Sequence, residues 1–202
     1  LEATALSTSG ESLLILTHLG MAFEEQSALL QLARENLLSQ EALELEVSRR
    51  TRDIRERESE ISGRLIYAAG YRDEETGSHI RRIGMYCAEM GRALGWSPLM
   101  VDDIQSAAPM HDIGKIGIPD AILKHPGKLD TAKFEIMKRH AEIGASILAS
   151  SDTPMVRMAA DIAGCHHERW DGEGYPRGLK GSNIPISARI VAIADVYDAL
   201  VH

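Results

Sequence analysis

The feature that most constrains the fold is a 3,4 spacing of apolar residues through the first third of the chain. The spacing starts at Leu16 and ends at Leu65, and most of its positions are apolar. Apolar residues repeated in this way lie along one side of a helix, where a second helix can cover them in a coiled coil. The positions are, in order, Leu16, Leu19, Phe23, Gln26, Leu30, Ala33, Leu37, Gln40, Glu44, Val47, Thr51, Ile54, Glu58, Ile61 and Leu65. The pattern predicts a long helix that forms a parallel homodimer, although Glu44 and Glu58 weaken the seam.

Two local signals refine this helix. Thr8-Ser9-Gly10-Glu11 matches a capping box, which predicts that the helix begins there. Ser39-Gln40 offers a break, so two shorter helices are the alternative to one long helix. The segment Arg49 to Glu60 is dense in mixed charge and is typical of an exposed connector. We therefore assign residues 1–63 to an N-terminal helical linker and dimerisation segment, with packing of the helix on its own domain as the alternative.

The rest of the chain has the pattern of shorter helices separated by breaks. Ser97-Pro98 and Thr153-Pro154 are each a cap residue followed by a proline at the first helical position. Helices are expected at 77–94 after a Thr76 cap and before Gly95, from 98 towards His111, from Asp130 or Thr131, at 155–166, and at 187–200 as a largely buried helix. A loop with four glycines and two prolines, 172–185, precedes the last helix. Because no convincing strand pair is present, the predicted fold class is all-α.

Composition excludes several classes of protein. The 22 Lys and Arg residues against 30 Asp and Glu give a net charge of −8, which argues against a broad basic face for long nucleic acid. No apolar run reaches the length of a bilayer span, and no signal peptide is evident. The two cysteines, Cys87 and Cys165, are too few and too far apart for a disulfide framework. These features predict a soluble cytoplasmic fragment.

The eight histidines give the strongest chemical signal. His166 and His167 are adjacent, and His79, His111 and His140 also fall at expected helix ends or faces. Neutral imidazole is the commonest metal ligand among side chains. Asp112 follows His111 directly, and Asp195 stands in an otherwise apolar run, where a carboxylate must be paired, coordinated or turned outward. Each residue alone is explained by a structural role, but together they indicate a metal site.

These residues together resemble the HD-GYP subgroup of the HD phosphohydrolase superfamily. The resemblance extends from about Arg64 to Leu200, and we assign residues 64–202 to an HD-GYP catalytic domain. The matching residues are Glu75, His79, His111-Asp112-Ile113-Gly114-Lys115, His140, His166-His167 and Asp195. Because the family continues after Asp-Ala-Leu into a segment with basic, phosphate-contacting residues, the domain is expected to be truncated after Val201-His202.

The resemblance implies a helical bundle around two or three divalent metal ions, iron or manganese first, with nickel, cobalt and zinc as alternatives. It implies that one ion is held by His79, His111, Asp112 and Asp195, that Asp112 bridges to a second ion held by His140, His166 and His167, and that Glu75 allows a third. Lys115 resembles the phosphate-contacting lysine, so Asp112 and Lys115 are the expected catalytic residues. Cys165 and His202 are not expected to be ligands.

The loop after the histidine pair is expected to contact substrate or a partner. Its candidate residues are Trp170, Gly172, Gly174, Tyr175 and Pro176. The two aromatic rings offer faces for a guanine base, and the resemblance implies contact with diguanylate cyclase domains. A loop whose Tyr175-Pro176 only packs on the core is the alternative.

The activity implied is hydrolysis of the bacterial second messenger cyclic di-GMP to linear pGpG or GMP. Two metal ions close together activate water and neutralise the charge of a phosphodiester, which makes in-line attack feasible. An upstream receiver or other sensor domain, as in two-component signalling, is expected to act through the N-terminal helix. The alternatives are a phosphodiesterase for another cyclic dinucleotide, such as cyclic GMP-AMP, and a sensor or scaffold that binds the dinucleotide with little turnover.

Overall fold

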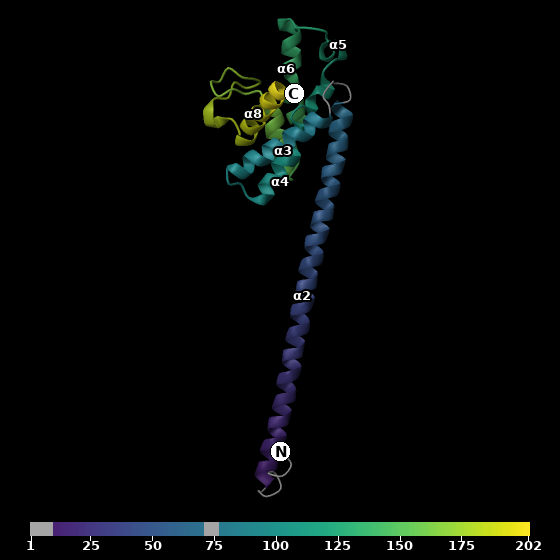
Figure 1. Cartoon of the computed structure of the whole chain (residues 1–202), viewed down its shortest axis with the longest axis vertical. Coiled ribbons are helices and arrows are strands. Elements are labelled where there is room, and N and C mark those ends of the chain that lie inside the picture. The colour runs from purple at the N-terminus through teal and green to yellow at the C-terminus, as the bar shows by residue number, and fades with distance from the viewer. Residues whose placement is uncertain (1–9, 71–76) are drawn as a thin grey trace. The chain divides into compact units, whose positions relative to one another are not determined.

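Every regular element of the described chain is a helix. The computed structural model describes residues 10–70 and 77–202, with side chains from residue 24 onward except 59, 62, 65 and 67–70, and it contains no strand within those ranges. The elements are α2 (Gly10–Gly70), α3 (Gly77–Ala93), α4 (Pro98–Ala107), η1 (Ala108–Met110), η2 (Ile113–Gly117), α5 (Asp120–Leu123), α6 (Thr131–Leu148), α7 (Pro154–Cys165), η3 (Gly181–Asn183) and α8 (Ile186–Val201), most of them labelled in Figure 1. The all-α prediction is confirmed.

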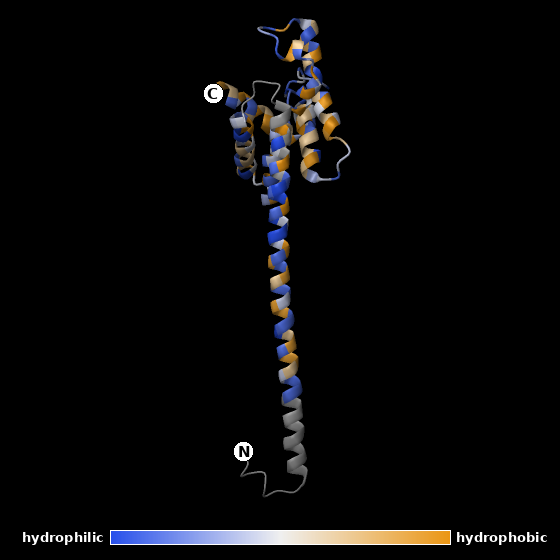
Figure 2. Cartoon of the chain, turned by 90° about the vertical axis from the view of Figure 1, so that its right-hand side faces the viewer, coloured by the Kyte–Doolittle hydropathy of each residue, from blue (hydrophilic) through white to orange (hydrophobic). Residues whose placement is uncertain are grey.

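The N-terminal helix α2 is continuous through Ser39-Gln40, so the two-helix alternative is wrong. Hydrophobic and hydrophilic residues alternate along it (Figure 2), and seam residues such as Leu30 and Leu37 are 66% and 57% exposed. Ion pairs within the helix stabilise its charged part: Glu46 accepts from Arg49 at 3.0 Å and from Arg50 at 2.6 Å. The capping box at Thr8 and the Thr76 cap lie outside the described residues.

No helix in the described ranges combines the length and the apolarity that a membrane span requires.

The contacts along the chain divide it into two compact units, Leu1–Arg57 and Glu58–His202. The second unit has one main apolar core, formed where α3, α4, α7 and α8 meet. Each of those helices contributes fully buried residues to the core, in order Ile83, Ile104, Ile162 and Val191.

Local signals set the ends of these helices. Ser97 caps α4 by accepting a hydrogen bond from the Met100 amide at 3.3 Å, and Asp130 caps α6 by accepting from the Lys133 amide at 2.8 Å. Thr153 precedes α7 but makes no side-chain cap. Each cap satisfies an amide that has no partner within its own helix. The predicted starts of all three helices are confirmed, but the predicted side-chain cap at Thr153 was wrong.

The last helix, α8, differs from its predicted burial. Its narrow buried stripe includes Ala188, Val191 and Ala194, whereas Ile193 and Val196 are 62% and 60% exposed. Because α8 has apolar residues on all of its faces, their periodicity does not indicate which face is buried. The prediction of a largely buried helix was wrong for that face.

The helix α4 stops short of His111, and His111 and Asp112 lie between the two 3-10 turns η1 and η2. The turn η2 packs its backbone directly onto α6 at Gly114. A Cβ atom at Gly114 would overlap the carbonyl oxygen of His140 and the amide nitrogen of Gly144. Only glycine allows this approach, which brings Asp112 against the helix that carries His140.

Replacing Gly114 with alanine tests this close contact. We expect Gly114→Ala to lower the free energy of unfolding by more than about 2 kcal/mol, because backbone atoms of α6 would have to move. Thermal denaturation followed by circular dichroism measures the change. Gly63→Ala is the matched control, since an added Cβ there meets nothing within 4 Å and stabilises a helix by about 1 kcal/mol. A Gly114→Ala protein as stable as the wild type would contradict the contact.

Candidate metal centre

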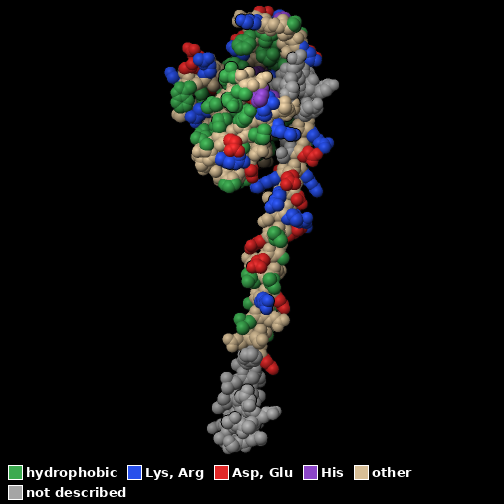
Figure 3. Space-filling view, viewed as in Figure 1, with side chains coloured by type: hydrophobic (Ala, Val, Ile, Leu, Met, Phe, Trp, Pro, Cys, Tyr) green, Lys and Arg blue, Asp and Glu red, His purple; other side chains and the backbone are tan. Residues whose placement is uncertain are grey.

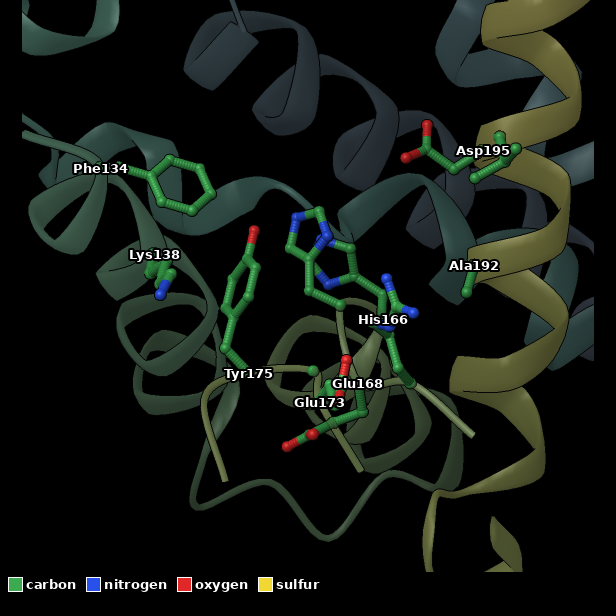
Figure 4. A pocket seen from close by; sticks show the side chains of 12 residues that line it. Phe134, Lys138, His166, Glu168, Glu173, Tyr175, Ala192 and Asp195 are labelled. Atoms are coloured by element: carbon green, nitrogen blue, oxygen red, sulfur yellow. The ribbon is translucent and has the colours of Figure 1, made fainter. Parts of the chain in front are cut away.

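Seven of the predicted ligands converge from five places in the second unit. His79 comes from α3, His140 from α6 and Asp195 from α8, while His111-Asp112 lies between η1 and η2, and His166-His167 follows the last residue of α7. Figure 4 shows His166 between the loop residue Tyr175 on one side and Asp195 of α8 on the other. The packing of the helices, rather than one continuous motif, therefore builds the site.

The carboxylate of Asp112 lies at the middle of the cluster. Its Oδ1 atom is 3.2 Å from Nε2 of His140 and 3.6 Å from Nε2 of His166. Its Oδ2 atom is 3.1 Å from Nε2 of His111. The two oxygens thus face different histidines, as a carboxylate that bridges two cations must.

The ligand atoms form two groups in which all members lie within 4.8 Å of one another. The first metal group consists of His79, His111 and Asp195, and the second metal group consists of Asp112, His140, His166 and His167. The sequence analysis had placed Asp112 with both groups. Glu75, the proposed extra ligand, lies outside the described residues.

Hydrogen bonds orient three of the imidazoles. Nδ1 of His111 lies 3.1 Å from the Ala108 carbonyl, Nδ1 of His140 lies 2.7 Å from the Met137 carbonyl, and Nδ1 of His166 lies 3.1 Å from the carbonyls of Ile162 and Ala163. A carbonyl only accepts, so each Nδ1 carries the proton and each Nε2 keeps its lone pair. The lone pairs face Asp112.

The buried polar atoms around Asp112 are suited to bind a cation. Among the described residues, the buried atoms Asp112 Oδ1, His140 Nε2 and His166 Nε2 have no hydrogen-bond partner. Buried polar atoms are rarely left in this state unless an ion or water satisfies them. A divalent cation bound by these atoms would satisfy all three, so the residues fit a metal site.

The pKa shifts of the candidate ligands favour the protonation states that bind a metal. Burial, together with His166 and His140, lowers the pKa of His167 to about 2, and burial lowers the pKa of His140. Burial alone would raise the pKa of Asp112, but His111, His166 and Lys115 hold it well below its usual range. Neutral imidazoles and an ionised carboxylate are the forms that bind metals.

A cavity of about 450 Å³ opens beside the second group of ligands. Tyr175 stacks on His167 with ring centroids 4.6 Å apart, and the Lys138 ammonium lies 5.5 Å from the Tyr175 ring. Figure 4 shows Phe134 and Lys138 beyond that ring, and Figure 3 shows histidine side chains at the surface near hydrophobic ones. The cavity therefore combines imidazoles of candidate ligands, an aromatic face and the ammonium group of Lys138.

The predicted catalytic lysine lies at the ligand cluster, where the ammonium group of Lys115 is 3.0 Å from the carboxylate of Asp112.

The glycine loop is held by a residue that the sequence analysis missed. Glu168 is buried, and its carboxylate accepts from the backbone amides of Arg177 and Leu179, each at 2.8 Å. Gly174 packs against the backbone at Glu168 and Arg169, where a Cβ would overlap, and Gly172 has a positive φ of 84°. A cis peptide joins Tyr175 to Pro176, and Trp170 is 63% exposed. In the sequence, the only signal for Glu168 was that it directly follows His167.

Two further residues have roles outside the ligand groups. Cys165 is buried and accepts from Arg177 at 2.8 Å, and neither Cys165 nor His202 belongs to either ligand group of the described residues. Asp198, which the sequence analysis missed, is buried between α3 and α8 and contacts His79 at 2.7 Å. Its spacing of three residues from Asp195 along a helix could have indicated it.

Comparisons with known proteins agree with this architecture. The sequence profile of the HD domain family matches residues 64–202. The chain is 55% identical over 131 residues to a cyclic di-GMP phosphodiesterase of Thermotoga maritima, covering 65% of this chain and 36% of the relative. It is 47% identical over 148 residues to the 3'3'-cGAMP-specific phosphodiesterase 2 of Vibrio cholerae, covering 73% and 28%. With the cyclic di-GMP phosphodiesterase response regulator RpfG of Xanthomonas campestris, identity is 45% over 177 residues, covering 86% and 47%.

The helical fold, the paired ligand groups and the profile match place the chain in the HD domain family. Within that family it is an HD-GYP protein, as its histidine pair and glycine loop had indicated. The chain spans 28% to 47% of the length of the three relatives.

Cation binding gives a direct test of the ligand cluster. We expect Mn²⁺ to raise the melting temperature of the metal-free protein, with about 2.7 kcal/mol of stabilisation at a free concentration 100 times the Kd. Asp112→Asn is expected to lose most of this gain, because the bridging charge is removed. Asp120→Asn is the control, since Asp120 has a 57% exposed side chain and belongs to neither ligand group. Equal stabilisation of all three proteins would exclude Asp112 as a ligand.

Proposed function

We propose that this chain is the catalytic part of a metal-dependent phosphodiesterase that hydrolyses cyclic di-GMP. The observation that carries the proposal is the Asp112 carboxylate, which faces histidines of both ligand groups beside an aromatic cavity. The names of the relatives support the same class of substrate. We propose residues 64–202 as the catalytic domain, with iron or manganese as the ions, because histidine-rich ligation suits both.

In this proposal the protein residues position the phosphodiester and the ions. Bound divalent ions would activate water and neutralise phosphate charge. Asp112 and the two groups of ligands would hold two such ions, and Glu75 would contribute to a third. Lys115, next to Asp112, would donate to a non-bridging phosphate oxygen and stabilise the charge that develops there.

The cavity is the proposed place for one base of the substrate. Tyr175 is stacked on His167, so one face of its ring is already used by the site itself. Phe134 is 43% exposed, and its ring lies 6.3 Å from that of Tyr175. This arrangement favours a role for Tyr175 in the cavity. The exposed Trp170 is the better candidate on this loop for contact with a diguanylate cyclase domain.

Cyclic GMP-AMP is a second candidate substrate. The Vibrio cholerae relative named for that dinucleotide is 47% identical to this chain. The metal ligands and Lys115 act on phosphates, so they do not distinguish the two dinucleotides. Selectivity would depend on contacts to the bases in the cavity.

Turnover is tested with protein purified anaerobically and loaded with Mn²⁺ or Fe²⁺. We expect the wild type to convert cyclic di-GMP to pGpG or GMP, and Asp112→Ala to show only background activity. Lys115→Met is expected to lower kcat about 100-fold, because one charged donor to the phosphate is lost. Chromatography of the products measures all three, and parallel reactions with 3'3'-cGAMP report selectivity.

The control for Lys115→Met is Lys124→Met, which removes a 58% exposed lysine paired with Asp120. A metal-loaded wild type that binds cyclic di-GMP in calorimetry but forms neither product would support the sensor or scaffold alternative. Faster hydrolysis of 3'3'-cGAMP than of cyclic di-GMP would favour the second substrate.

We further propose that α2 forms a parallel dimer that transmits a signal from a receiver or other sensor domain in the cytoplasm. The exposure of its seam leucines supports this arrangement, since a dimer would cover them. A soluble helix that exposes many large apolar side chains is stabilised by a partner that removes them from water.

The seam assignment makes a specific prediction for two neighbouring leucines. Leu37 is a seam position and Leu38 is not, yet their exposed fractions are 57% and 55%. We expect Leu37→Glu to weaken dimerisation more than about tenfold, because two carboxylates would face each other across the interface. Leu38→Glu is the matched control and is expected to leave the dimer intact. Sedimentation and light scattering measure the change; a monomeric wild type at high concentration would exclude the dimer.

A further inference from the structure

The Nδ1 atom of His79 has a different kind of partner from the Nδ1 atoms of His111, His140 and His166. In His111, His140 and His166 the Nδ1 atom faces a main-chain carbonyl of the same local turn. In His79 the Nδ1 atom lies 2.7 Å from Oδ2 of Asp198, which is 119 residues away in the sequence. The orientation of this ring therefore depends on a side chain from another helix.

Asp198 is itself fixed by an arginine. Nε of Arg82 donates to Oδ1 at 2.6 Å, and Nη2 donates to Oδ2 at 2.8 Å. The Asp198 side chain is only 3% exposed. The hydrogen bonds from Arg82, followed by that from His79, hold the pKa of Asp198 well below its usual range against the effect of burial. Two-point contact with a planar guanidinium fixes a carboxylate more tightly than a single contact with lysine.

The four residues form matched pairs on two helices. His79 and Arg82 are three residues apart on α3, and Asp195 and Asp198 are three apart on α8, so each pair lies on one helix face. While Nδ1 of His79 faces Asp198, its Nε2 lies 3.6 Å from Oδ1 of Asp195. One edge of the ring thus meets the buried ion pair, and the other edge meets a ligand of the first metal group.

We propose that Asp198 and Arg82 are positioning residues for the first metal group, holding His79 as its Nδ1–H tautomer so that Nε2 is directed at the cation. An ionised carboxylate only accepts hydrogen bonds, so it requires the proton on Nδ1 and leaves the lone pair on Nε2. A carboxylate behind a ligating histidine also makes it a stronger donor to the metal. The inference rests on the metal centre of the proposed function.

The other explanation is that Asp198 and Arg82 only clamp α3 to α8. A clamp would affect stability and both metal groups alike, since α3 and α8 help to form the whole core. A positioning role would affect the His79 group selectively, because the rings of His140 and His166 are fixed by their own carbonyls. Metal affinity at each group therefore separates the two explanations.

The test uses the full chain with two kinds of substitution. Asp198→Asn keeps the size of the side chain but removes its charge, and its amide group can donate to Nδ1, which favours the wrong tautomer. Arg82→Met leaves Asp198 in place but removes its support. Arg81→Met is the matched control, because Arg81 is the exposed neighbour on the same helix. Arg82→Lys keeps the charge without the two-point contact.

Mn²⁺ titration of metal-free protein gives the affinity of each group. We expect Asp198→Asn and Arg82→Met to weaken one bound ion about 10- to 100-fold and leave the other unchanged. Arg82→Lys is expected to retain part of the affinity, and Arg81→Met all of it. In Zn²⁺-loaded protein, nitrogen NMR is expected to show the His79 Nδ1–H signal in the wild type and its loss or broadening in Asp198→Asn.

Two results would overturn the inference. The first is wild-type affinity for both ions, with an unchanged His79 signal, in folded Asp198→Asn and Arg82→Met proteins. The second is an equal loss of both ions with a lower melting temperature, which would show a clamp alone. Turnover of cyclic di-GMP is measured separately. A wild type without turnover but with the selective metal effect would contradict the proposed function and support the inference.

Discussion

The contact between the η2 turn and α6 is the constraint on which the metal centre depends. Gly114 lets the two backbones approach so closely that Asp112 reaches the helix that carries His140. Asp112 then has histidines on both sides, and its two oxygens face different ones. A wider separation between the turn and the helix would leave two unconnected clusters. The meeting of the two groups of candidate ligands at Asp112 thus begins with the absence of a side chain at Gly114.

The sequence indicated the candidate ligands better than it indicated the residues around them. Seven of those candidates, which stood out as histidines and carboxylates at helix ends and in apolar runs, lie together in the structure. Asp198 and Glu168 were missed because their roles depend on partners distant in sequence or on backbone amides of a folded loop. Nothing in the local pattern around either residue identifies those partners.

Helix positions were predictable where a local cap was present, as at Ser97 and Asp130. The 3-10 turns around His111 were not, because short turns lack periodicity and are set by packing against α6. The exposed face of α8 was also hidden from the sequence. A helix with apolar residues all round gives the same pattern whether one face or every face is covered.

The end of α7 has a consequence for the choice of metal. The ring of His166 donates to the carbonyls of Ile162 and Ala163 in the last turn of the helix, where carbonyls run out of helical partners. The backbone amide of His166 also donates to the Ile162 carbonyl, at 2.9 Å. The same residue therefore ends the helix and faces the metal site. Aspartate or glutamate at this position could bind a cation but could not donate to those carbonyls. The helix end thus favours a nitrogen donor at this position, and with it cations that accept imidazole.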